Sequence, residues 1–138
     1  FSLPAARMVG GNGKVVCVDM QKRMLDVLSR RSMKAKLQNI IALHQCTQKS
    51  LCIDDWKGQI DFAFAIALVH EVPDKENLFC EIRDAMKPSA QFLIAEPKGH
   101  VTEDQMDNSL KLAEKAGFVQ LEKGLDGYMR YVVMQKNV

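Results

Sequence analysis

Short runs of apolar residues alternate along this chain with amphipathic segments of helical spacing, and this alternation constrains the fold most. The first run, Val15–Val18, is mostly β-branched and apolar throughout, as in a strand that is covered on both faces. Two further runs, Ile40–Leu43 and Phe62–Val69, have the same character. The run Phe62–Val69 is expected to leave strand geometry near Ala67. Strands of this kind occur in parallel sheets between layers of helices. The pattern predicts an α/β fold.

The segments between these runs have the spacing of amphipathic helices. We expect helices over residues 1–9, 20–37, 73–87 and 102–116, with Lys87-Pro88 ending the third. Gln91–Ala95 is a further expected strand, and residues 118–136 are expected to form two strands about a turn at Gly124–Gly127. The prediction is one domain, residues 1–138, with a mostly parallel sheet and an antiparallel hairpin at its C-terminal end.

Composition narrows the classes of function. The formal net charge is only +2, which argues against a dedicated nucleic-acid surface, and the basic segment 22–36 is interpreted as the solvated face of a helix. The apolar runs are too short to span a membrane. The four cysteines form no C-x-x-C pair and are expected to be reduced thiols. We therefore expect a soluble cytoplasmic protein without a metal site.

Candidate binding residues follow the expected strands, because ligands of open α/β sheets bind beyond the carboxyl ends of the strands. Asp19 ends the first strand, where an acidic side chain either accepts hydrogen bonds from both hydroxyls of a ribose or caps the next helix. Met20 either lies against an adenine ring or packs in the core.

A ribose-binding acid should follow a glycine-rich turn by about 20 residues. Counting back from Asp19 leads to Phe1 or before it. The glycines Gly10–Gly13 follow an expected helix and precede an expected strand, so we interpret them as a connection. The glycine-rich turn and its strand are therefore expected to be absent from these 138 residues.

Several ordered motifs carry a family resemblance that covers essentially the whole chain. They are Phe1-Ser2-Leu3-Pro4-Ala5-Ala6, Gly13–Asp19, Ile60-Asp61-Phe62, Leu68–Val72 and Leu93–Pro97. The chain resembles class I S-adenosylmethionine-dependent methyltransferases, especially the small-molecule enzymes related to the ubiquinone and menaquinone pathways. The resemblance implies a Rossmann-like sheet, S-adenosylmethionine as cofactor, and methyl transfer to a small-molecule acceptor by in-line attack on the sulfonium methyl.

The resemblance also implies roles for individual residues. By position, Asp19 would hold the ribose, Met20 would lie beside the adenine, Thr47 or Gln48 would bond the adenine, and Ala65 and Ile66 would lie under the methionine part. Thr47 and Gln48 stand where the family has a Gly-Asp-Ala-like segment, so these contacts would involve uncharged partners.

His70 is the candidate catalytic residue. It would either take a proton from the acceptor or position groups around it. His100 could reach the same cleft from the next loop. Glu96 could line the substrate side, but we favour a solvated or hydrogen-bonded loop carboxylate. Glu71 has the same two interpretations, and for it we favour capping or solvent exposure.

The expected loss of the first strand leaves two functional hypotheses. Either the chain is a methyltransferase, or it is an inactive methyltransferase-like domain that serves as a binding or assembly module. A missing central strand would expose unpaired backbone groups, which a second copy or a strand from another chain could fill. A nicotinamide-dependent oxidoreductase shares the ribose acid but does not predict the segments Leu68–Val72 and Ala95–Pro97.

Overall fold

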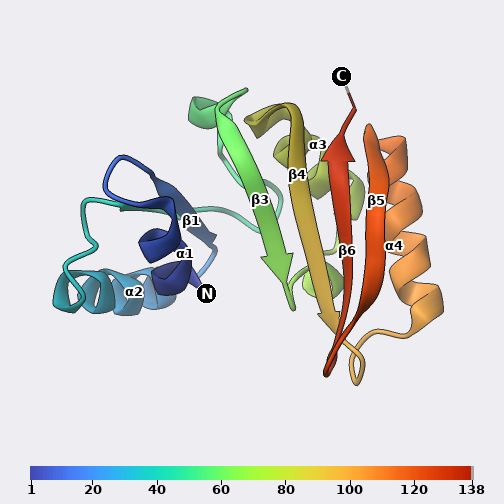
Figure 1. Cartoon of the computed structure of the whole chain (residues 1–138), viewed down its shortest axis with the longest axis horizontal. Helices are drawn as coiled ribbons and strands as arrows, with labels where there is room; N and C mark the ends of the chain where they lie inside the picture. The colour runs from blue at the N-terminus through green and yellow to red at the C-terminus, as the bar shows by residue number, and fades with distance from the viewer. Residues whose placement is uncertain (138) are drawn as a thin grey trace. The chain divides into compact units, whose positions relative to one another are not determined.

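The computed structural model describes residues 1–137 and divides the chain into two compact units, Phe1–Cys52 and Ile53–Val138 (Figure 1). We describe each unit by itself. The prediction of one domain over residues 1–138 stays a prediction.

The first unit is a small α/β layer. Its elements are α1 (Ser2–Val9), β1 (Val15–Asp19), α2 (Lys22–Lys34) and β2 (Ile41–Gln45). The strands pair in parallel, from Val15 opposite Ile41 to Asp19 opposite Gln45. Parallel pairing brings the carboxyl ends of both strands to the same edge, where ligands of such sheets bind.

The second unit contains a four-stranded sheet. Its elements are the short 3-10 helices η1 (Asp54–Trp56) and η2 (Val69–Glu71), the strands β3 (Ile60–Ile66), β4 (Met86–Pro97), β5 (Phe118–Asp126) and β6 (Met129–Lys136), and the helices α3 (Lys75–Ala85) and α4 (Glu103–Lys115). The strand order is β3-β4-β6-β5. The β3–β4 pair is parallel, and β6 pairs antiparallel with both β4 and β5.

Helices α3 and α4 pack on the same face of this sheet (Figure 1). Phe92 of β4 is fully buried beneath them, and its ring centroid lies 6.2 Å from that of Phe79 on α3 and 5.5 Å from that of Phe118 on β5. Burial of such aromatic side chains is the main driving force for this packing.

These pairings confirm the predicted fold class, an α/β fold with parallel pairs and a C-terminal antiparallel hairpin. Some boundaries were wrong. The third long helix ends at Ala85 and β4 begins at Met86, because the residue before Pro88 disfavours helical backbone. Gly124 lies inside β5, and the turn contains Gly127 and Tyr128 instead.

Two further observations concern the described residues. No helix within residues 1–137 has the length and apolar content needed to cross a bilayer. All four cysteines are free thiols, and burial raises the pKa of the Cys17 thiol, which packs within β1.

Candidate functional site

A buried carboxylate organises the end of β3 in the second unit. Glu96, the penultimate residue of β4, is 2% exposed. Its Oε1 accepts hydrogen bonds from the backbone N–H groups of Leu68 and Val69, both at 3.0 Å. Its Oε2 accepts from the backbone N–H of His70 at 3.2 Å and lies 2.5 Å from Nδ1 of the same residue. The turn after β3 therefore wraps around this one side chain.

The local backbone explains how three successive N–H groups reach Glu96. The chain leaves strand geometry at Ala67, whose φ of 54° lies in the left-handed region, and the Ala67 N–H donates to the carbonyl of Ala95 at 2.8 Å. The short helix η2 then turns the following N–H groups inward. A buried carboxylate costs free energy unless such donors surround it, so turn and carboxylate depend on each other.

The contact with Glu96 fixes which imidazole nitrogen carries the proton in neutral His70. A carboxylate only accepts hydrogen bonds, so Nδ1 donates and Nε2 keeps its lone pair. The Oε1 of Glu71, on a well-exposed side chain, lies 3.9 Å from Nε2. The buried carboxylate therefore orients the imidazole, whether the ring acts as a base or only positions other groups.

His70 and Glu96 line a cavity of about 380 Å³. His100 and Val101, from the loop after β4, form part of its wall, and the other lining residues come from the start of α3 and from α4: Lys75, Gln105, Asn108, Ser109 and Leu112. The rings of His70 and His100 are stacked, with centroids 5.8 Å apart and planes inclined by 19°. The cavity thus presents two imidazoles, one carboxylate, one lysine, three neutral polar side chains and two apolar ones.

Three of the residues proposed from sequence lie at this end of the second unit. Ala65 and Ile66 end β3, and His70 follows in η2. Ala65 is buried, whereas Ile66 is half-buried. The proposed roles of Ala65 and Ile66 at the cofactor stay predictions.

The other four proposed residues lie at the carboxyl edge of the first unit. Asp19 ends β1, and its Oδ1 accepts the backbone N–H of Gln21 at 2.8 Å, just before α2. Within residues 1–137 its Oδ2 has no hydrogen-bond partner. Met20 is half-exposed beside it. Asp19 therefore supports the helix start and retains one oxygen for a ligand.

Thr47 and Gln48 follow β2 at the same edge. The Thr47 Oγ1 accepts the N–H groups of Lys49 and Ser50, at 3.3 and 3.1 Å, so this hydroxyl stabilises its own turn. Gln48 is exposed. Of the two, Gln48 is the side chain more available to a ligand.

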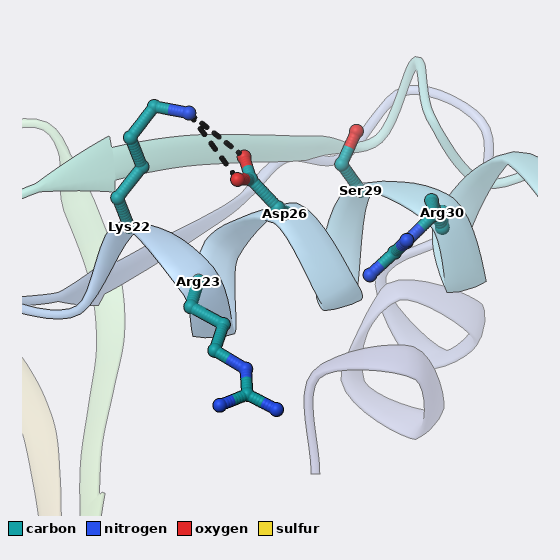
Figure 2. Close-up of a pocket in the computed structure, with 5 residues that line it drawn as sticks. All are labelled: Lys22, Arg23, Asp26, Ser29 and Arg30. Carbon is teal, nitrogen blue, oxygen red and sulfur yellow. Dashed lines mark hydrogen bonds and ion pairs between the residues drawn. The ribbon is translucent and has the colours of Figure 1, made fainter.

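A second hollow, of about 440 Å³, lies on the exposed face of α2. All five of its lining residues belong to this one helix, and Figure 2 shows Lys22 turned toward Asp26 while Arg23 points away from them. The Lys22–Asp26 distance is 3.2 Å, a typical exposed ion pair four residues apart. This hollow is similar in size to the cavity at His70, but it offers only solvated polar and charged side chains, which do not form a reaction site.

Glu96 is hydrogen-bonded, as one of its two expected interpretations had it, but it is buried within β4 and not solvated in a loop. It is the hydrogen-bond acceptor for a whole turn. The signal was an acidic residue directly after the apolar run Phe92–Ala95. Within residues 1–137, no three His, Cys, Asp or Glu side chains are grouped as a metal site requires.

Comparison with protein-family models gives one match over nearly the whole chain. Residues 1–135 match the model described as a methyltransferase domain. No curated protein sequence matches the chain.

Solved structures share the fold at low sequence identity. A SAM-dependent methyltransferase from Aquifex aeolicus has a TM-score of 0.82 and 22% identity, with 96% of this chain and 74% of that chain covered. The [4+2]-cyclase SpnF has a TM-score of 0.79 and 13% identity, covering 99% and 71%. Geranyl diphosphate C-methyltransferase from Streptomyces coelicolor A3(2), solved with Mg²⁺, geranyl diphosphate and S-adenosyl-L-homocysteine, has a TM-score of 0.75 and 14% identity, covering 99% and 66%.

Proposed function

Because this chain belongs to the methyltransferase-domain family, we propose that it transfers a methyl group from S-adenosylmethionine to a small-molecule acceptor. The observation that carries the proposal is the His70–Glu96 pair on the wall of a cavity. The proposed acceptor group is a hydroxyl, because a hydroxyl must lose its proton when it attacks a methyl group. The pair supplies a base for that proton.

The residues of the first unit fit the adenosine part of the cofactor. Asp19 keeps Oδ2 available at the carboxyl end of a parallel strand, where an acid can accept hydrogen bonds from ribose hydroxyls. Met20 presents a half-exposed thioether to an adenine ring, and the Gln48 amide is exposed for hydrogen bonds to its edge. In the second unit, Ala65 and Ile66 are the candidates for the methionine part. When bound, S-adenosylmethionine supplies an electrophilic methyl group.

The chain's own contribution to the reaction is orientation and proton transfer. The acceptor hydroxyl gives its proton to Nε2 of His70, and the imidazolium that forms is stabilised by the carboxylate of Glu96 at Nδ1. The cavity walls hold the acceptor in position for in-line attack, which contributes several kcal/mol to the lowering of the barrier.

The alternative is a domain that binds a partner and does not catalyse. A histidine that merely positions groups would have the same hydrogen bonds as a base. The fold by itself does not specify methyl transfer, since the [4+2]-cyclase SpnF shares it at a TM-score of 0.79.

The test is a methyl-transfer assay on the full-length protein with tritium-labelled S-adenosylmethionine and a panel of small phenols and alcohols. We expect label in at least one acceptor, and His70→Gln should lower the rate by about 10²-fold or more, the range for loss of a general base. Glu114→Gln, which changes an exposed carboxylate of α4, is the control and should leave the rate unchanged. If His70→Gln transferred methyl groups at the wild-type rate, His70 would not be the general base. No transfer to any acceptor would favour the binding module.

A further inference from the structure

The tip of the β5–β6 hairpin touches the loop that carries His100. The two strands are joined by Gly127 and Tyr128 alone, and Gly127 has a φ of 55°, which favours glycine at this point of a tight hairpin. The Tyr128 carbonyl accepts the backbone N–H of Lys98 at 3.0 Å. The Arg130 Nε donates to the carbonyl of Val101 at 3.3 Å. The hairpin therefore holds the loop on both sides of His100.

Gly99 shows how closely the hairpin tip and the loop approach each other. A Cβ atom built at Gly99 would lie 2.1 Å from the Tyr128 hydroxyl oxygen, and the three nearest atoms all belong to Tyr128. The backbone of Gly99 is not in the left-handed region, so the effect of a side chain at this position is to displace the Tyr128 ring and not to strain the backbone.

The exposure of Tyr128 also indicates that its contact with the loop holds this side chain in place. This side chain is 62% exposed, so burial in a core does not account for its position. What fixes it are its contacts with residues 98–99, directly before the histidine that stacks on His70.

We propose that Tyr128 is a positioning residue whose side chain, through its contact with Gly99, holds His100 beside His70 at the wall of the acceptor cavity. The inference rests on the proposed function only in calling this cavity the acceptor site. His70 is held by Glu96 and His100 by the hairpin, so the two imidazoles have separate supports. Loss of one support should leave the other histidine in place.

The test is proton NMR of the full-length protein, without cofactor or acceptor, with nuclear Overhauser cross-peaks between the rings of His70 and His100 as the readout. Tyr128→Ala removes the side-chain contact with Gly99 and keeps the carbonyl that accepts the Lys98 N–H, and Gly99→Ala drives the tyrosine ring away. Each should weaken the cross-peaks at least twofold while the Nδ1–H signal of His70 persists. In the double variant the cross-peaks should not be weaker than in the single variant that loses more intensity, because both changes break the same contact.

Two controls separate positioning from general stability. Leu121→Ala, on the same hairpin and half-exposed, should keep the cross-peaks of wild type. Cross-peaks between Phe79 and Phe92 report whether the core is intact in every variant. If Gly99→Ala does not fold, Tyr128→Ala alone tests the inference, because this truncation adds no atoms and introduces no clash.

Cross-peaks between His70 and His100 of wild-type intensity in folded Tyr128→Ala would overturn the inference. Joint loss of the His70 Nδ1–H signal would also overturn it, since the two supports would not be separate. The NMR sample contains neither cofactor nor acceptor. Failure of the methyl-transfer assay would therefore not change the outcome of this test.

Discussion

The carboxylate of Glu96 holds His70 twice, through the ring Nδ1 at 2.5 Å and through the backbone N–H at 3.2 Å. One side chain therefore sets both the path of the turn after β3 and the orientation of the imidazole. Stability of the turn and chemistry of the histidine are coupled through this residue.

Substitution of Glu96 by Ala should strongly destabilise the second unit. Three N–H groups, one buried and two part-buried, would lose their acceptor, and a buried unsatisfied donor costs about 1–3 kcal/mol, so we expect the free energy of unfolding to fall by about 2 kcal/mol or more. Glu96→Gln keeps an acceptor oxygen and should cost less. Urea unfolding of both variants measures the difference, and equal losses would contradict the hydrogen-bond account.

The proton of neutral His70 should reside on Nδ1. Nitrogen-15 NMR of the imidazole distinguishes the two neutral forms, and we expect Nδ1–H with an unprotonated Nε2 in the wild type. Glu96→Leu removes the acceptor, and the Nε2–H form should then gain population. If the proton in the wild type lay on Nε2, that nitrogen could not accept a proton from the acceptor, and His70 could not act as the proposed base.

Tyr131 should titrate above its ordinary range. Its hydroxyl donates to Oε1 of Glu122 at 2.6 Å, and this hydrogen bond, with the negative charge of Glu122, raises the pKa of the phenol. The folded state holds this proton more tightly than the unfolded state. The resulting stabilisation is complete below the ordinary pKa of about 10 and is lost as the pH rises through the folded pKa. Tyrosinate absorbance measured against pH in a Tyr128→Phe background gives the titration midpoint of Tyr131. Glu122→Gln should lower this midpoint. An unchanged midpoint would exclude Glu122 as the cause of the raised pKa.

Two phenylalanines offer a matched test of the core. Phe92 is fully buried between Phe79 and Phe118, whereas Phe62 on β3 is half-exposed. Phe92→Ala should lower the free energy of unfolding by about 3–5 kcal/mol, the usual cost of a large cavity, and Phe62→Ala by clearly less. Thermal or urea unfolding gives both values, and comparable losses would mean that Phe62 is covered in solution.

The local pattern was enough to predict most elements, because strand and helix periods differ. The apolar run after Asp61 predicted a strand that ends near Ala67, and β3 does end at Ile66. The pattern was weaker near Pro88, where the apolar residue Met86 fits the end of a helix as well as the start of a strand. The structure assigns Met86 to β4.

Contacts between distant residues could not be predicted in this way. Glu96 lies 26 residues from His70 in sequence, and its role depends on the parallel pairing of β3 and β4, which brings their carboxyl ends together. The contact of Gly99 with Tyr128 likewise requires the hairpin to fold back. Single residues such as His70 could be named as candidates, whereas their supports became visible only in the structure.

Cofactor binding tests the central claim most directly. We would titrate S-adenosylhomocysteine into the full-length protein by calorimetry and compare wild type with Asp19→Asn, which can still accept the N–H of Gln21, and Asp19→Ala. We expect binding near micromolar in the wild type, and weakening by roughly 1.5–3 kcal/mol, about 10- to 150-fold, in Asp19→Ala. Asp26→Ala, at an exposed carboxylate of the same unit, should bind as the wild type does. Unchanged affinity in Asp19→Ala, or no binding by the folded wild-type protein, would contradict the account.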